Sequence, residues 1–132
     1  MYKPSHVLKA LPGDSSSKQL PLSKAKSLCD KSRSCHGLQE YYEIGENKKL
    51  IRENDQSFKM WSKVFDNNGG INWHYMGGFR LETSDKRYFP SMLQARIECI
   101  RMGEQCSGVN LVYELRGGDL VRGREGLNVW VK

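Results

Sequence analysis

Apolar residues recur at helical spacing in two short segments of the sequence. The first segment has Leu22, Ala25, Leu28 and Cys29 at these positions, and the second has Met92, Ala95, Cys99 and Met102. This spacing places the apolar side chains of each segment on one face of a helix. Ser91 follows a proline and precedes Gln94 by three residues, which is the pattern of a capping box at a helix start. We therefore expect two short helices, each with a cysteine on its buried face.

Segments rich in β-forming residues follow each predicted helix. After the second helix they are Val109–Leu115, Leu120–Val121 and Leu127–Val131, with Gly117-Gly118 as a turn signal between the first two. After the first helix the counterparts are Leu38–Tyr42, Leu50–Ile51 and Phe58–Trp61, and further strands are expected at Val7–Leu11 and Phe79–Leu81. A short helix packed on a small antiparallel sheet is the α+β arrangement that this order favours.

The same order of predicted elements, a helix and then strands, occurs twice along the chain and indicates an internal repeat. Leu8–Lys63 can be laid on Phe79–Lys132, and the cysteines, a glycine, a Tyr-Glu pair and a Trp-x-Lys ending then coincide. Cys29 matches Cys99, and Trp61 and Lys63 match Trp130 and Lys132. The sequence thus predicts two domains, 1–66 and 72–132, joined by a turn-rich connector at 67–71.

Composition narrows the class of protein. The 132 residues are 38% hydrophobic and carry a net charge of +6, which is typical of a globular domain with a basic surface. No apolar run is long enough for a membrane helix, and the first residues lack the apolar stretch of a signal peptide. This favours either a cytosolic protein or one whose leader lies outside these residues.

Catalytic patterns are weak. The three histidines, His6, His36 and His74, stand in no recognisable motif, and the glycine pairs have no Lys-Ser/Thr sequel of a phosphate loop. Carboxylates are scattered without a distinctive pair. We therefore expect a protein that is not an enzyme and that needs no cofactor.

The four cysteines form one closely spaced pair in each repeat. The pairs are Cys29 with Cys35 and Cys99 with Cys106. Small domains are often stabilised by disulfides, and a bridge from each helix to the following strand is our first interpretation. The alternatives are a zinc site that also uses His36, for which the spacing is too wide, and reduced thiols in the core. We expect no metal.

The repeat resembles the PAN/apple family of cysteine-stabilised extracellular modules. Cys29 and Cys99 match the second helix cysteine of that family, and Cys35 and Cys106 match its strand partner. The positions of the family's second bridge are apolar here: Ala25 and Ala95 on the helices, and Met60 and Val129 before the tryptophans. The resemblance implies two degenerate tandem copies in a secreted or cell-surface protein that binds proteins, carbohydrates or sulfated glycans without catalysis.

Basic and aromatic residues supply the candidate ligand site. We expect one basic loop in each repeat, between its second and third strands after the helix; the residues are Lys48, Lys49 and Arg52, then Arg116, Arg122 and Arg124. A further basic group, Lys24, Lys26, Lys31 and Arg33, lies on and after the first helix, where a solvated surface explains it equally well. Among aromatic residues, Tyr41 is the candidate for exposure, and Trp73 and Tyr75 either contact ligand or pack between strands.

These observations predict an extracellular, non-enzymatic binding or adhesion module. Its ligand would be a carbohydrate, as in a lectin, or a surface protein, and two copies would permit bivalent binding. Sulfated glycans suit the basic surface. The alternative is an intracellular nucleic-acid-binding protein with reduced thiols, although no nucleic-acid recognition motif is present.

Overall fold

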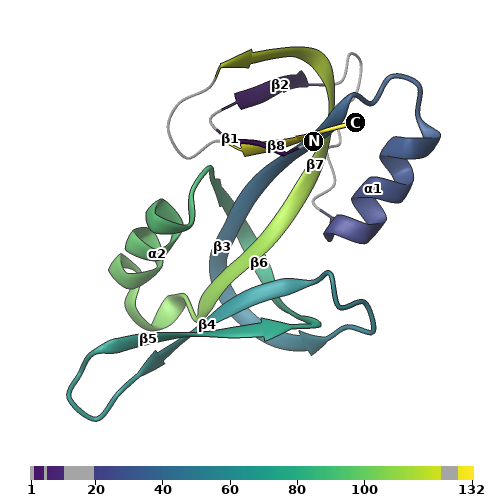
Figure 1. The fold of residues 1–132 in the computed structure, drawn as a ribbon. Coiled ribbons are helices and arrows are strands. Elements are labelled where there is room, and N and C mark those ends of the chain that lie inside the picture. Colours follow the sequence, from purple (N-terminus) through teal and green to yellow (C-terminus); the bar gives the residue numbers. More distant parts are fainter. Residues whose placement is uncertain (1, 5, 11–19, 123–127) are drawn as a thin grey trace. The chain divides into compact units, whose positions relative to one another are not determined.

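The computed structural model describes residues 2–4, 6–10, 20–122 and 128–132, excluding the side chains of residues 7–10, 45–48, 83–86 and 118. Both predicted helices are confirmed: α1 spans Leu22–Lys31 and α2 spans Met92–Arg101 (Figure 1). The predicted cap is also present, because the Ser91 side chain accepts a hydrogen bond from the Gln94 backbone N–H at 3.2 Å. α2 is followed by a 3-10 turn, η1, at Gly103–Gln105.

Antiparallel strands make up most of the rest, which confirms the α+β class. The described strands are β1 (Tyr2–Pro4), β2 (His6–Ala10), β3 (Gly37–Arg52), β4 (Lys59–Phe65), β5 (Ile71–Gly77), β6 (Phe79–Phe89), β7 (Gly108–Arg122) and β8 (Asn128–Val131).

Two of the predicted strand breaks are wrong, because β3 and β7 each run on as one long strand. The expected turn at Gly117-Gly118 is instead a register shift within β7: Leu8 pairs with Leu120, whereas Ala10 pairs with Arg116. A bulge of this kind absorbs extra residues without reversing the chain, and glycine is frequent at such positions. β3 has similar shifts against β6 between Gly45 and Lys49.

The chain divides into two compact units that do not follow the two halves of the sequence. Unit 1 comprises Met1–Tyr41 with Val112–Lys132, and unit 2 comprises Tyr42–Leu111. The predicted domains 1–66 and 72–132 therefore differ from the observed division. The predicted connector lies inside unit 2, where it is the turn of the β4–β5 hairpin: the Asp66 N–H donates to the Gly70 carbonyl oxygen at 2.9 Å.

The two units have equivalent patterns of strand pairing. In unit 1, β1 pairs with β8, and β8 pairs with the start of β3 at Gly37–Glu40. In unit 2, β5 pairs with β4, and β4 pairs with the start of β7 at Gly108–Leu111. The ends of the long strands have equivalent partners, since β7 pairs with β2 and β3 pairs with β6. The two tandem PAN-like copies themselves stay a prediction.

One disulfide fastens each helix to the strand that follows it. The bonds are Cys29–Cys35 in unit 1 and Cys99–Cys106 in unit 2, which confirms both predicted pairs. All four cysteines are buried, together with Ala25 and Ala95 on the same helix faces. In unit 2, Ala95, Cys99 and Cys106 form a buried core together with Ile44 and Val109. No thiolate remains for the zinc site considered above.

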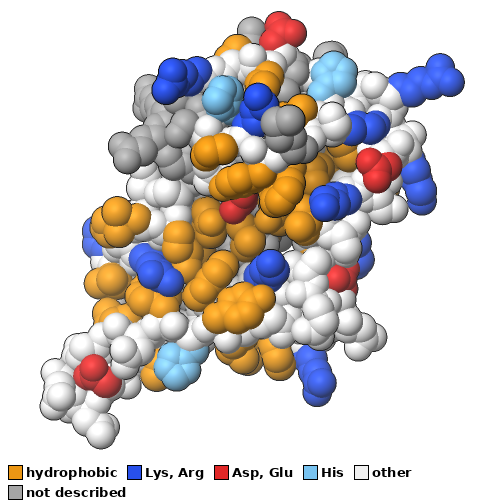
Figure 2. Space-filling model, viewed as in Figure 1, with side chains coloured by type: hydrophobic (Ala, Val, Ile, Leu, Met, Phe, Trp, Pro, Cys, Tyr) orange, Lys and Arg blue, Asp and Glu red, His pale blue; other side chains and the backbone are white. Residues whose placement is uncertain are grey.

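The outer face of α2, opposite Ala95 and Cys99, is exposed in the described part of the chain. Apolar side chains are exposed along it, and Figure 2 shows hydrophobic side chains gathered over the region that α2 occupies in Figure 1. Among the residues that the structure describes, no helix is long and apolar enough to cross a membrane.

Candidate functional site

A cavity of about 310 Å³ lies between α1 and the β3–β8 pair of unit 1. Its lining residues are Lys26, Cys29, Asp30, Gly37, Leu38, Trp130, Val131 and Lys132. A second, more open hollow of about 500 Å³ adjoins it and shares Val131 and Lys132. Together they form the candidate site, and every lining residue belongs to unit 1.

The fold fixes the walls of this cavity. Lys26 and Asp30 are four residues apart on α1, so they lie on one helix face. The Cys29–Cys35 disulfide anchors the end of that helix to the segment that leads into β3. On the opposite wall, the Trp130 ring of β8 packs against Tyr2 of β1, with 5.0 Å between ring centroids. The cavity is therefore framed by a disulfide-anchored helix and a paired strand.

Cationic groups dominate the charge of the site. The Lys26 ammonium lies 5.3 Å from the centroid of a Trp130 ring, a cation–π distance. The Lys132 ammonium donates to the carbonyl oxygens of Cys29 at 2.6 Å and Ser32 at 2.9 Å. An ammonium has three N–H donors, so these two bonds leave one without a partner among the described residues, and that one can bind a ligand.

The adjoining hollow adds Arg33 and His36 to the two lysines. Among the described residues that line the two cavities, Asp30 is the one with a carboxylate side chain. Such a lining attracts an anionic group and offers an indole ring beside it.

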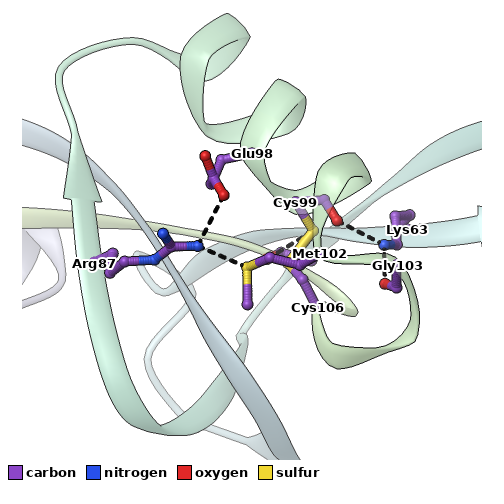
Figure 3. Close-up of a disulfide and its surroundings, with 8 residues drawn as sticks. Lys63, Arg87, Glu98, Cys99, Met102, Gly103 and Cys106 are labelled. Carbon is purple, nitrogen blue, oxygen red and sulfur yellow. Dashed lines mark hydrogen bonds and ion pairs between the residues drawn. A yellow bond between two sulfur atoms is a disulfide. The ribbon is translucent and has the colours of Figure 1, made fainter.

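Unit 2 carries the matching lysine in a different setting (Figure 3). The Lys63 ammonium donates to the carbonyl oxygens of Cys99 at 2.9 Å and Gly103 at 2.6 Å, at the end of α2. Lys63 is only 8% exposed, and burial lowers the pKa of its ammonium. Lys132 is exposed. The same contact therefore closes both helices, but only the lysine of unit 1 also faces solvent.

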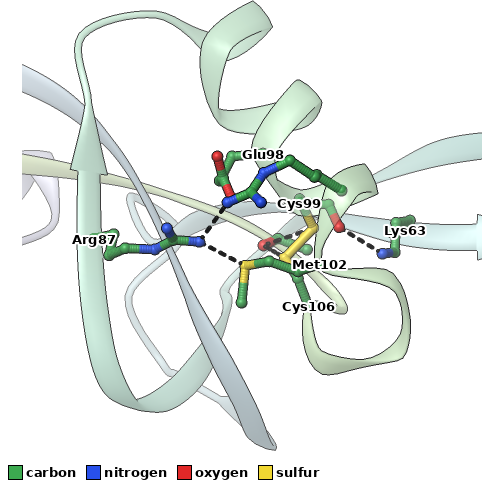
Figure 4. A network of polar contacts seen from close by, with 8 residues as sticks. Lys63, Arg87, Glu98, Cys99, Met102 and Cys106 are labelled. Atoms are coloured by element: carbon green, nitrogen blue, oxygen red, sulfur yellow. Dashed lines mark hydrogen bonds and ion pairs between the residues drawn. A yellow bond between two sulfur atoms is a disulfide. The ribbon is translucent and has the colours of Figure 1, made fainter.

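The α2 end of unit 2 also holds a network of arginines on one carboxylate (Figure 4). Arg87 donates to Glu98 at 3.2 Å and to the Met102 sulfur at 2.9 Å, and Arg101 also bonds Glu98. These hydrogen bonds, Arg101 first, hold the pKa of Glu98 below its usual value. The network links β6, through Arg87, to the carboxyl-terminal part of α2.

The first predicted basic loop is not a loop. Lys49 and Arg52 are exposed on β3, where they pair with Glu82 and Phe79 of β6. The error arises because β3 continues through the segment that the sequence assigned to a loop. The backbone of Lys48 is part of the same strand, and its side chain lies outside the described residues.

The arginines of the second predicted basic loop do not share one environment. Arg116 on β7 donates to the Tyr41 hydroxyl at 2.6 Å and forms an ion pair with Glu114 at 3.0 Å. Burial raises the pKa of Tyr41, which is half-buried rather than fully exposed. Arg122 is exposed at the end of β7, and Arg124 lies outside the described residues. The structure thus brings Arg116 and Tyr41 together, and the hydrogen bond between them engages both side chains.

The two predicted aromatic residues of β5 lie in different surroundings. Trp73 packs against the unit 2 core, with the Arg96 guanidinium 5.2 Å from the centroid of one of its rings. Tyr75 is more exposed, and its ring lies 5.5 Å from that of Trp61. This Trp61–Tyr75 pair is the unit 2 counterpart of the Trp130–Tyr2 pair.

The cavity residues were not singled out from the sequence as a site. Two signals were available: the basic group on and after α1, which includes Lys26 and Arg33, and the repeated Trp-x-Lys ending. Neither signal shows that Lys132 of the second half lies against the helix of the first half. Within the described ranges, no group of three or more His, Cys, Asp and Glu residues is placed to hold a metal ion.

Comparisons of the chain with protein-family models, with curated proteins and with solved structures find no match. The resemblance to PAN/apple modules accordingly stays a prediction.

Proposed function

We propose that the protein is an extracellular, non-enzymatic binding module that recognises an anionic carbohydrate in the α1 cavity of unit 1. The observation that carries this proposal is the combination of Lys26, Lys132 and the Trp130 ring around one cavity. Sulfated or carboxylated sugars present both an anionic group and an apolar ring face. The site offers a partner for each.

The size of the cavity suits a single saccharide unit of a longer chain. Its volume of about 310 Å³ lies at the lower end of the roughly 300–1,000 Å³ typical of small-molecule pockets. The adjoining hollow, with Arg33 and His36, offers room and charge for a second anionic group. A ligand with regularly spaced charges would contact both.

The two disulfides support an extracellular location, because such bonds persist in oxidising compartments. They also weigh against the alternative of an intracellular nucleic-acid-binding protein with reduced thiols. Nucleic acids and sulfated glycans are both polyanions, so the experiment must distinguish between binding of the two.

The test measures the binding of defined oligosaccharides to the whole protein by titration calorimetry. The probes are a heparin oligosaccharide, its desulfated counterpart and a single-stranded DNA of similar charge. Lys26→Gln should weaken binding of the sulfated probe about tenfold, since a hydrogen bond to a charged group contributes roughly 1.5–3 kcal/mol. The matched control is Lys31→Gln, which removes the same charge from the same helix outside the cavity.

Three results would contradict the proposal. Equal losses in Lys26→Gln and Lys31→Gln would indicate only a general charge effect. A larger loss in a Lys49→Gln, Arg52→Gln double variant would place the site on β3. Tighter binding of DNA than of the sulfated probe would favour the hypothesis of a nucleic-acid-binding protein.

A further inference from the structure

The outer face of α2 carries three exposed apolar side chains in a row. Leu93 is 68% exposed, Ile97 57% and Ile100 46%. Their spacing of four and then three residues places them on one helical stripe, here called the α2 stripe. Single exposed apolar residues are common, whereas a contiguous apolar patch marks an interaction surface.

The matching helix shows that the fold does not require this stripe. At the equivalent positions α1 has Ser23, Ser27 and Asp30. Both helices bury the same inner pair, Ala25 and Cys29 in α1 and Ala95 and Cys99 in α2. The α2 stripe is therefore additional to the packing that holds each helix.

Arginines flank the stripe on both sides. With 3.6 residues per turn, Arg96 lies on one side of the stripe and Arg101 on the other. Arg101 shares the single carboxylate of Glu98 with Arg87, so that cluster has one more positive than negative charge (Figure 4). Arg96 stacks on Trp73, and within the described part of the chain it forms no ion pair.

We propose that the α2 stripe binds an acidic amphipathic helical segment of a protein partner. Apolar residues of the partner would pack between Leu93, Ile97 and Ile100, and its carboxylates would pair with Arg96 and with the Arg87–Arg101 cluster. The two helices would pack along their apolar stripes as in a coiled coil, with charge complementarity that fixes the orientation of the partner. The site lies in unit 2 and does not depend on glycan binding in unit 1.

A second copy of the chain fits this surface less well. Antiparallel pairing of two α2 helices about Ile97 is isologous, so each flank meets its own counterpart. Arg96 would then face Arg96 of the other copy. An acidic segment instead meets the basic flanks with opposite charge.

The test selects peptides of about 15 residues, roughly four helical turns, from a displayed library on the whole protein. Selection is run against an Ile97→Glu variant in parallel, and the enriched peptides are synthesised for affinity measurement. We expect net-negative sequences with apolar residues at i, i+3 or i+4, and i+7. Their binding should weaken at least tenfold in Ile97→Glu and severalfold in Arg96→Gln.

The matched control is Ser27→Glu, which places the same charge at the equivalent position of α1 and should leave peptide affinity unchanged. Far-ultraviolet circular dichroism checks that each variant is folded. The proposal is overturned if no peptide is enriched over the Ile97→Glu selection, or if the enriched peptides are neutral or basic.

Two further measurements test whether a lipid surface or a second copy of the chain occupies the α2 stripe. Co-sedimentation with phosphatidylcholine–phosphatidylserine vesicles that is lost in Ile97→Glu would assign the stripe to a lipid surface instead. Concentration-dependent dimerisation that is lost in the same variant would assign it to a second copy. Either result would overturn the proposal.

Discussion

Replacing Lys63 by methionine tests the contact that closes α2. Methionine keeps most of the length and apolar contact of the side chain but removes the ammonium. The carbonyl oxygens of Cys99 and Gly103 would then lose the donor that lies 2.9 and 2.6 Å away. The positive charge at the carboxyl end of the helix, where a cation is favourable, would also be lost.

The expected loss of stability follows from opposing terms. Hydrogen bonds to a charged group contribute about 1.5–3 kcal/mol each, and leaving a buried acceptor unpaired costs about 1–3 kcal/mol. The desolvation of the buried ammonium offsets part of the stabilisation that these hydrogen bonds give to the wild type. The same desolvation lowers the pKa of Lys63. We expect Lys63→Met to reduce the free energy of unfolding by about 2–3 kcal/mol, a fall in Tm of roughly 8–12 °C.

Lys132 provides the internal comparison, because it makes the same pair of contacts at the end of α1 but is exposed. Water can replace its hydrogen bonds, so Lys132→Met should reduce the free energy of unfolding by only about 0.5–1 kcal/mol. Lys59→Met, on the same strand as Lys63, controls for the loss of one charge. Urea denaturation followed by tryptophan fluorescence gives all three values.

The pH dependence supplies a second readout. The folded state of the wild type releases the Lys63 proton at a lower pH than the unfolded chain does. The advantage of the wild type over Lys63→Met should therefore grow as the pH rises toward about 10. A loss in Lys132→Met equal to that in Lys63→Met would refute the argument from burial.

Three other predictions concern the scaffold. Replacing Cys99 and Cys106 together by alanine should reduce the free energy of unfolding by about 2–3 kcal/mol, measured in urea, because the loop they close spans seven residues. Gly108→Ala should destabilise unit 2 by about 1–3 kcal/mol, with Ser107→Ala as control, because the added methyl would collide with the Trp61 carbonyl oxygen. Burial raises the pKa of Tyr113, so the folded state keeps this proton where the unfolded chain loses it; the free energy of unfolding should fall above about pH 10, and less steeply in Tyr113→Phe.

Local patterns in the sequence were sufficient to predict both helices. Helical spacing, the Ser91 cap and the cysteine on each inner face involve residues within one or two turns of each other. The disulfide pairs are local for the same reason, since each joins residues six or seven positions apart.

Strand partners were not predictable in this way. Nothing near Gly117-Gly118 in the sequence indicates that β2, more than 100 residues earlier, keeps this segment extended by pairing with it. The same limit explains why Arg116 was expected in a basic loop, whereas it contacts Tyr41 across 75 positions. The candidate cavity depends on such a distant contact, because Lys132 reaches the end of a helix about 100 positions away.

The paired lysines connect the two halves of the sequence. Lys63 of the first half binds α2 of the second half, and Lys132 of the second half binds α1 of the first half. Each unit thus takes its helix from one half of the sequence and the strand that closes that helix from the other. A fragment of residues 1–66 would contain α1 without β8 or Lys132, so the predicted first domain lacks part of its own unit. The two helices share this scaffold but differ at matched positions: Asp30 of α1 lines the proposed cavity, whereas Ile100 of α2 belongs to the exposed apolar stripe.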